Sequence, residues 1–553
     1  MMDGHGRRRA GTTALGLITA LLVLAGTACS GAKTTEANGP TQTTQPAPNG
    51  VGGMTFGPPD GAVTDGGKLT YGIDAEPEGL DPTKFAFSQA GHAVASAVFD
   101  PLATVDDKGN YKPYLATAID HSSDNKTWTF TLPDGVAFHD GSKLDAAAVV
   151  TVMSAHQASP ITGPALNGVL TSVEAKDPTH VVFNLKKAAF AFPLLLTTQA
   201  GYIVAPAMLT NPEGAKKPVG SGAFVFDSHE DGKVWRLKKN PTYWNKGLPH
   251  LDTIEFQPVA DNLERATKLS NGDLDVIQIL GGAPMIELRN STTYKRVENL
   301  NGDKTFLMLN TTKPPFDKLS ARQALAHATD ASAYRKEVSA DTAKEITSPY
   351  GVGQPGYLQD NGYPKYDVAE AKRLTKQYET EAGAPLEFEF LAVDDTQNAK
   401  MSQLFQEQFA AVGMKVTVKQ LPQINLLAQV AVGNYQLSQF RLFAAPNPDA
   451  DVHFYRGSSV VTPGISINFP RYVNPEVDAA IDAAVASGDN TVRAQNYEKV
   501  SKIFAEQVPF VWLGQTTWML AANPKVNGIY EAANGTIATI GAKTWIANLS
   551  ISR

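Results

Sequence analysis

The sequence predicts an α/β protein with more than one domain. Short runs that alternate between apolar and polar residues, the pattern of strands, recur along the chain between segments with helical spacing of apolar residues. With 553 residues, of which 42% are hydrophobic and 19% charged, the chain is long enough for two or three globular domains. Alternating strands and helices indicate layered α/β architecture and argue against an all-β fold or a helix bundle.

The first half of the folded body is richest in strand signals. Residues 68–73 and 128–132 alternate between apolar and polar side chains, as half-buried strands do. Asp145 precedes an apolar segment at 146–156, and its carboxylate is expected to cap that helix. Two further strands are predicted at 181–185 and 234–237.

The second half is more helical. A helix is expected at 320–329 with Ser320 as its cap, because apolar side chains there fall on one face. A second helix is expected at 399–412, with Gly413 as its stop and a strand at 414–418 directly after it. Two last helices are predicted at 475–487 and 493–508.

The N-terminus has the organisation of a signal peptide, which we assign to residues 1–28. Three arginines at 7–9 are followed by an apolar run at 14–25 and then by small residues. That run is shorter than the roughly 20 residues that a permanent membrane helix needs. A twin-arginine export signal is the less favoured alternative, because the apolar pair that usually follows its arginines is missing.

Cys29 is the only cysteine in the chain, so it cannot form an intramolecular disulfide. Its position after Gly26-Thr27-Ala28 resembles a bacterial lipobox, in which the cysteine is lipidated, although Gly26 stands where leucine is usual. The alternative is an ordinary cleavage site with an incidental cysteine. From Cys29 to residue 65 the chain is rich in Thr, Pro, Gly, Gln and Asn, and this composition predicts a flexible tether.

Composition and motifs exclude several classes of function. The net charge of −7 and the lack of a basic stripe argue against nucleic acid as a partner. No nucleophile elbow, paired-histidine zinc motif or phosphate-binding loop is present, so we expect neither an enzyme nor a cofactor. His139-Asp140 suggests a general base, but the pair sits in a tight turn and a structural role is favoured. Asp449, Asp451 and His453 suggest a cation site, but a solvated loop is the favoured interpretation, and no metal is expected.

Four blocks of sequence resemble one known family. The run WTFTLPDGVAFHDG at 128–141 resembles the signature of the family 5 extracellular solute-binding proteins, the peptide, dipeptide and nickel-type receptors of ABC importers. Further blocks follow the family's order and span nearly the whole mature chain. They are EPEGLDP at 76–82, PVGSGAF at 218–224 with LKKNPTYW at 237–244, and NPEVD at 474–478 leading to VPFV at 508–511.

The resemblance implies a type II periplasmic-binding-protein-like fold, with two α/β lobes joined by a hinge and a ligand cleft between them. It also implies an additional domain on the first lobe, as in the larger receptors of the family. The matching blocks place the first lobe at 66–104, 217–300 and 526–553, the additional domain at 105–216, and the second lobe at 301–525.

The resemblance also implies candidate ligand-binding residues. In peptide-binding relatives, a carboxylate of the second lobe pairs with the α-ammonium of the peptide, and an ungapped match places Ala445 there, with Leu442 where those relatives have tryptophan. A buried ammonium without an anion costs several kcal/mol. Asp449 or Asp451 therefore substitutes through a loop shift, or the ligand has no free amino group. Arg441 is a candidate for an anionic group, with a surface position as the alternative, and Glu76 is a candidate for the cleft.

The function implied is capture of a peptide or similar small polar solute for an ABC importer. The expected partners are this ligand, the importer permease and, through the lipid anchor, the membrane; the chain is expected to be monomeric. The expected location is the outer face of the bacterial cytoplasmic membrane, in the periplasmic space. Two alternatives stay open: a ligand-free receptor-like scaffold that regulates envelope processes, kept in view by Ala445, and a secreted hydrolase, disfavoured by the missing motifs.

Overall fold

The residues that the computed structural model describes all lie within 47–553. The described residues are 54–56, 61–105, 110–299, 303–442, 447–529, 531–532, 536–537, 539–540, 543–544 and 546–552. The predicted signal peptide, Cys29, most of the predicted tether and Ala445 lie outside them. Among the described helices, none has the length and hydrophobicity of a transmembrane segment.

An eight-stranded sheet organises the part of the molecule that we call the first lobe. Its strand order is β1-β15-β21-β14-β2-β13-β12-β11. The central strand β2 runs parallel to β13 and β14, and the other neighbours are antiparallel. The strands are β1 (Met54–Phe56), β2 (Lys68–Ile73), β11 (Phe224–Glu230), β12 (Val234–Lys239), β13 (Thr253–Pro258), β14 (Val276–Leu280), β15 (Lys295–Asn299) and β21 (Trp518–Ala522).

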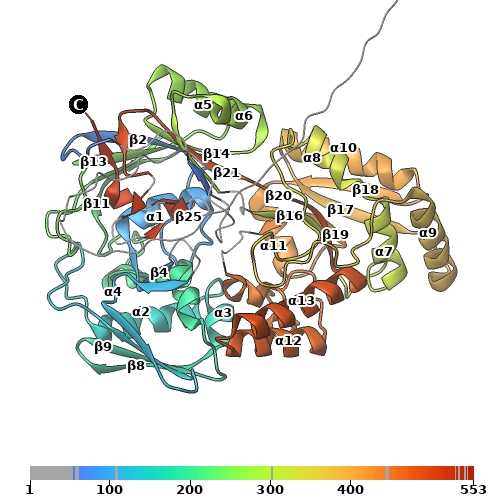
Figure 1. Ribbon diagram of the computed structural model, residues 1–553, viewed down its shortest axis with the longest axis horizontal. Coiled ribbons are helices and arrows are strands. Elements are labelled where there is room, and N and C mark those ends of the chain that lie inside the picture. Colours follow the sequence, from blue (N-terminus) through green and yellow to red (C-terminus); the bar gives the residue numbers. More distant parts are fainter. Residues whose placement is uncertain are drawn as a thin grey trace, which may run out of the picture. The chain divides into compact units, whose positions relative to one another are not determined.

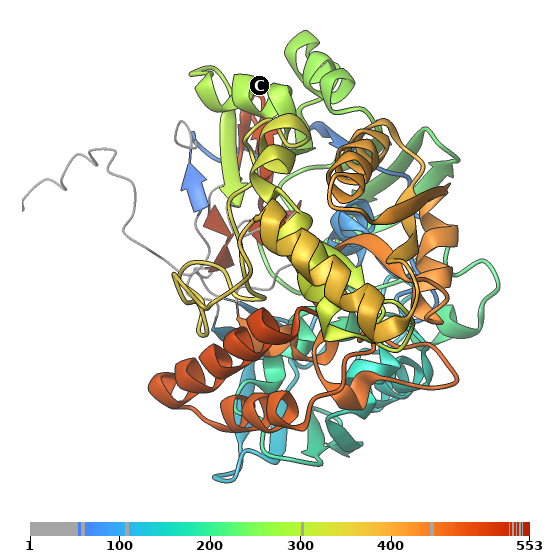
Figure 2. The ribbon, with the colours of Figure 1, turned by 90° about the vertical axis from the view of Figure 1, so that its right-hand side faces the viewer.

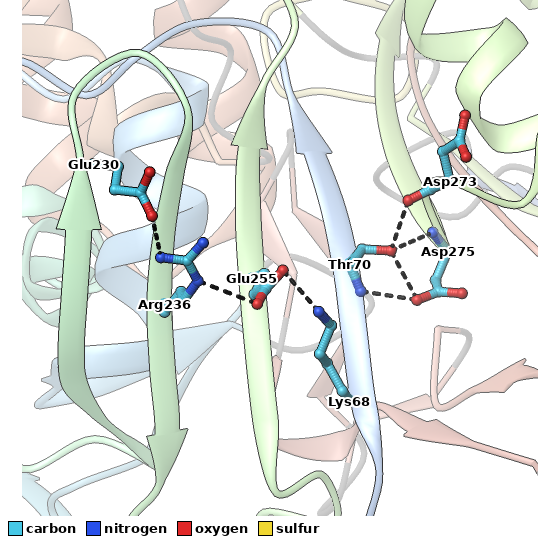
Figure 3. Close-up of polar contacts among 7 residues, drawn as sticks. All are labelled: Lys68, Thr70, Glu230, Arg236, Glu255, Asp273 and Asp275. Atoms are coloured by element: carbon cyan, nitrogen blue, oxygen red, sulfur yellow. Dashed lines mark hydrogen bonds and ion pairs between the residues drawn. The ribbon is translucent and has the colours of Figure 1, made fainter.

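A row of polar contacts crosses this sheet from strand to strand (Figure 3). Arg236 on β12 pairs with Glu230 at 2.6 Å and with Glu255 at 3.3 Å, and Lys68 pairs with Glu255 at 3.0 Å. Thr70 extends the row toward β14, because its main-chain N–H donates to the carboxylate of Asp275 at 2.8 Å. These groups are partly exposed, so each ion pair contributes at most about 1 kcal/mol.

A five-stranded sheet of order β18-β17-β19-β16-β20 organises the second lobe. Side chains of β16 alternate between two cores, with Phe306 and Met308 on one face and Leu307 and Leu309 on the other. Figure 1 shows three helices beside this sheet, and a pair of helices on its other side. The three are α7 (Leu319–Ala328), α9 (Val368–Ala382) and α10 (Thr396–Ala410), and the pair is α12 (Pro475–Ala486) and α13 (Asn490–Gln507). The strands are β16 (Lys304–Leu309), β17 (Glu387–Val393), β18 (Lys415–Leu421), β19 (Leu437–Leu442) and β20 (Phe510–Gln515).

A four-stranded antiparallel sheet of order β6-β7-β9-β8 forms an additional domain. Helix α2 packs on it, and Asp145 caps α2 by accepting from the N–H of Ala148. The core of this domain is continuous with the core of the first lobe. The strands are β6 (Ala118–His121), β7 (Thr127–Thr131), β8 (Leu170–Asp177) and β9 (His180–Leu185). Pairs of short strands are β3 (Asp100–Pro101) with β10 (Tyr202–Ile203), β4 (Ala103–Val105) with β5 (Tyr111–Pro113), β22 (Val526–Asn527) with β27 (Ser550–Ile551), β23 (Glu531–Ala532) with β24 (Thr536–Ile537), and β25 (Thr539–Ile540) with β26 (Lys543–Thr544).

The helices connect and cover these sheets, and Figure 2 shows those of the second lobe facing the viewer. Those of the first lobe and the additional domain are α1 (Gln89–Val98), α2 (Ala146–Ala158), α3 (Gly163–Asn167), α4 (Pro206–Thr210), α5 (Asn262–Asn271) and α6 (Gly282–Asn290). Those of the second lobe are α7 (Leu319–Ala328), α8 (Ala331–Glu337), α9 (Val368–Ala382), α10 (Thr396–Ala410), α11 (Gln423–Ala431), α12 (Pro475–Ala486) and α13 (Asn490–Gln507).

Two predictions from the sequence need correction. The second lobe was expected to extend to residue 525, but β21 pairs with β14 and β15, so the chain returns to the first lobe at 516–517. Ser320 was expected to cap its helix, but α7 begins after Lys318, which makes no side-chain cap. The hydroxyl of Ser320 instead donates to Glu381 at 2.6 Å.

Candidate functional site

The chain crosses between the lobes at two places that lie side by side. The first crossing links β15 to β16 through Asp303, and the second links β20 to β21 through Thr516. The N–H of Thr516 donates to the carbonyl of Asp303 at 2.7 Å, and the hydroxyls of Thr305 and Thr516 are 3.1 Å apart. We call these two hydrogen-bonded crossings the hinge, because short connections between domains are where hinge rotation takes place in proteins.

An ion pair between a partly exposed arginine and a buried carboxylate lies at this hinge. Arg441, on β19, places Nε 3.0 Å from Oδ2 of Asp303, whose side chain is 1% exposed. The guanidinium lies 5.7 Å from the ring centre of Trp518, at the start of β21. Burial raises the pKa of Asp303 to about 6, while Arg441 and Trp518 act to lower it and Asp74 to raise it. Arg441 therefore connects the second lobe to both crossings.

Asp451 belongs to a second ion pair at the hinge, and both members of this pair are buried. Its Oδ2 lies 3.2 Å from Nζ of Lys304, the first residue of β16, and the two side chains are 9% and 2% exposed. The buried hydroxyls of Tyr350 and Tyr455 have pKa values raised well above the usual range by burial and by nearby carboxylates. The Asp451 carboxylate thus already has a cationic partner.

Asp449 is held in the body of the second lobe. Its two oxygens accept from Nη1 and Nη2 of Arg493 at 2.9 and 2.7 Å, and both side chains are about 5% exposed or less. The hydroxyl of Tyr497 donates to the same carboxylate at 2.5 Å. This arrangement fixes the short helical turn Pro448–Ala450 against α13.

Glu76 follows β2 in the first lobe. Its Oε1 lies 2.8 Å from Nε2 of His229 and accepts from the indole N–H of Trp235 at 2.6 Å. His229 stacks on Trp235 with ring centres 3.8 Å apart. The second oxygen, Oε2, is buried and has no hydrogen-bond partner among the described residues. Glu76 is not among the residues that line the cavity between the lobes described below.

The loop that contains Asp449 and Asp451 was expected to be solvated, but both carboxylates are largely buried in the ion pairs described above. His139 has partners that account for it without chemistry. His139 Nδ1 accepts from the N–H of Gly220, so Nε2 carries the proton and donates to the carbonyl of Gly222 at 2.9 Å. Burial lowers the pKa of His139, which keeps the ring neutral. Within the described part of the chain, no group of three or more His, Cys, Asp or Glu residues is placed to hold a metal ion.

A small cavity of about 70 Å³ lies between the lobes next to the hinge. The first lobe contributes Leu280, Gly281 and Gly282, at the start of α6, and the second lobe contributes mainly polar side chains. Gly282 also joins the lobes directly, because its N–H donates to Oγ1 of Thr342 at 3.2 Å. The polar side chains that line the cavity are Thr305, Tyr334, Ser339, Thr342, Gln397, Asn398, Gln439, Arg441 and Thr516.

The additional domain contacts the second lobe independently of the hinge. The N–H of Phe190 donates to the carbonyl of Val485 at 2.9 Å. Lys187 pairs with Asp482 at 2.6 Å. Apolar side chains of this domain pack against Ala450. The second lobe is therefore contacted by both the first lobe and the additional domain.

Sequence reasoning placed Arg441 and Glu76 among the candidates but missed Asp303 and Lys304. Asp303 precedes β16 and Lys304 begins it, with no motif around either residue, and their importance arises only from the contacts that they make at the hinge. Leu442, which ends β19, pairs in the ladder with Lys304 and so lies at the hinge end of the sheet.

Two α/β lobes, two hydrogen-bonded crossings and a polar cavity lined from both lobes define a two-lobed binding protein. The model of the bacterial extracellular solute-binding proteins, family 5, matches residues 110–462, and the chain belongs to this family. Members of the family are extracytoplasmic receptors that bind solutes for ABC importers, and this chain is a solute-binding protein of that kind.

Curated relatives match over most of their length. The chain is 28% identical to the glutathione-binding protein GsiB of Escherichia coli O1:K1 / APEC over 465 residues, which cover 82% of this chain and 89% of the relative. The glutathione-binding protein GsiB of Pectobacterium atrosepticum is also 28% identical, with the same coverage.

Solved structures share the fold. AgaA of A. tumefaciens R10, in complex with agropinic acid, has a TM-score of 0.78 and 24% identity, covering 88% of this chain and 99% of the other. DppA of Helicobacter pylori, in complex with the peptide STSA, has a TM-score of 0.77 and 22% identity, covering 89% and 99%. These likenesses confirm the predicted two-lobed type II fold.

Proposed function

We propose that this receptor captures a short peptide or a comparably polar solute outside the cell and delivers it to an ABC importer. The observation that carries the proposal is the polar cavity that both lobes line, next to the two crossings of the hinge. The relatives named as glutathione-binding proteins make glutathione the first solute to test. We further propose that the chain is not an enzyme, because a receptor releases its solute unchanged and needs no covalent step.

Closure of the two lobes over a bound solute would couple binding to transport. A ligand that contacts both lobes has its full set of contacts only when they approach each other, so it shifts the population toward that arrangement. The shift is limited by the difference in affinity between the two arrangements. The importer would then recognise the closed receptor, and release would follow reopening.

The candidate residues divide into two groups. Asp449 and Asp451 are engaged by Arg493 and Lys304, so we do not assign them the α-ammonium of a peptide. Glu76 offers a buried oxygen that has no partner among the described residues. We propose that Glu76 accepts a hydrogen bond from an amino or amide group of the solute.

We also propose that Cys29 carries the lipid anchor and that the receptor acts as a monomer at the outer face of the membrane. Replacing Cys29 by serine should move the protein from the membrane fraction to the soluble fraction. Retention of the Cys29→Ser protein in the membrane fraction would contradict the anchor while leaving the receptor function intact.

Binding can be tested by calorimetric titration of the purified full-length chain with glutathione and a set of di- and tripeptides. We expect saturable binding of at least one of them, and Glu76→Gln should weaken it by roughly ten-fold, which is about 1.4 kcal/mol. Absence of binding to every member of the set would count against a peptide-type solute and favour another polar class.

A further inference from the structure

The geometry points to the cavity at Arg441 as a subsite for an oxyanion, and we infer that it takes a carboxylate group of the transported solute. This inference rests on the proposed receptor function and adds the chemistry of the solute to it. An anionic group held here would distinguish the solute from one anchored only through its ammonium.

Arg441 is positioned in advance for this role. Its Nε forms an ion pair with Oδ2 of Asp303 at 3.0 Å, and the guanidinium carbon lies 5.7 Å from the ring centre of Trp518. The side chain is 35% exposed and lines the cavity. Among the described residues, no hydrogen bond is found for the two terminal nitrogens, which form one edge of a planar fork that matches the two oxygens of a carboxylate. A lysine in its place would lack this geometry.

The rest of the cavity wall favours a negative group. Among the described residues that line it, Arg441 is the only one with a full charge, and no carboxylate lies on the surface of the cavity. Thr305, Ser339 and Thr516 add hydroxyls, and Asn398 and Gln439 add amides, so the wall offers several neutral donors. An anion would therefore meet a cation and donors, with Asp303 behind the guanidinium and outside the lining.

The size of the cavity limits what enters it. Its 70 Å³ compares with about 10–15 Å³ for one water molecule in the same measure. It therefore accepts one end group of a solute, such as a carboxylate, and the rest of a tripeptide such as glutathione would lie outside it. Because both lobes line the cavity, an anion bound there contacts both, and its binding favours the approach of the lobes.

The test compares acids with their neutral forms in the wild-type chain and in three variants. Glutathione, its diethyl ester, and dipeptides with free or amidated C-termini are titrated calorimetrically into the full-length chain and into Arg441→Gln. A second arm adds acetate or inorganic phosphate at matched ionic strength and follows thermal unfolding. Arg373→Gln is the matched control, because Arg373 is 58% exposed on α9 and pairs only with Glu370 in the ion pairs described. Arg441→Lys keeps the charge and guards against a simple loss of folding.

We expect the acids to bind at least about ten-fold more tightly than the esters or amides in the wild-type chain and in Arg373→Gln. We expect this preference to disappear in Arg441→Gln and to shrink in Arg441→Lys. Stabilisation by acetate or phosphate that depends on Arg441 would also support the subsite, whereas such stabilisation without binding of any acid solute would overturn its assignment to the transported solute. Equal binding of acids and neutral forms, or anion effects unchanged in Arg441→Gln, would overturn the inference. Peptide binding that persists in that case would leave the receptor function standing.

Discussion

Replacing Asp449 by alanine separates a structural role for this carboxylate from a role as a ligand anchor. The change leaves the guanidinium of Arg493 buried, with its side chain 4% exposed and its bidentate partner gone. Breaking a buried pair in this way costs about 3–5 kcal/mol. For a lobe of about 200 residues, a loss of about 4 kcal/mol lowers the unfolding midpoint by roughly 8–16 °C.

The assay is thermal unfolding followed by calorimetry, with Asp227→Ala as the matched control. Asp227 is 47% exposed and pairs with Lys238 on the surface, so its loss should cost less than about 1 kcal/mol. The reasoning would be refuted if Asp449→Ala unfolded like the wild-type chain yet lost solute binding, because Asp449 would then serve the ligand and not the fold.

Three further predictions concern other parts of the chain. Gly222→Ala should destabilise the fold by about 1–3 kcal/mol in denaturant titrations, because the new Cβ would lie 2.4 Å from a main-chain carbon of Val98; an unchanged midpoint would contradict the packing. Lys187→Ala should change the unfolding free energy by less than about 1 kcal/mol, because Lys187 is 75% exposed where it pairs with Asp482, and a larger loss would show that this contact between domains matters more than its exposure implies. Burial raises the pKa of Asp100 from 3.8 to about 6, so the folded state binds the proton more tightly than the unfolded state. The contribution of Asp100 to stability should therefore fall by about 3 kcal/mol as the pH rises from about 4 to 6, and Asp100→Asn should remove that part of the pH dependence; an identical profile in the variant would refute it.

The strands were predicted well where their signal is local. The expected strand at 68–73 is β2, and the strand expected at 128–132 is β7 within one residue, because side chains that alternate between core and surface leave a period of two in the sequence. Asp145 caps its helix as expected, since capping depends on residues close in the chain. Gly413 adopts a left-handed conformation just after α10 ends, which agrees with its predicted role as a stop.

The lobe boundary and the site depend on contacts that the local sequence does not record. Only Thr516 and Thr517 separate β20 from β21, and both strands are fully buried, so no change of composition marks the return to the first lobe. Asp303 becomes notable only because folding brings Arg441, 138 positions later, against it. The family resemblance supplied the two-lobed plan, which the alternation of helices and strands alone left open.

The most direct test of the receptor function is native mass spectrometry of the full-length chain, purified from membranes in mild detergent, before and after denaturation. The account predicts a complex heavier than the chain, which releases a small polar solute on unfolding. Solute at 100 times its dissociation constant should then stabilise the protein by about 2.7 kcal/mol. A mass equal to the bare processed chain, together with no thermal stabilisation by glutathione, peptides or other polar solutes, would contradict the account.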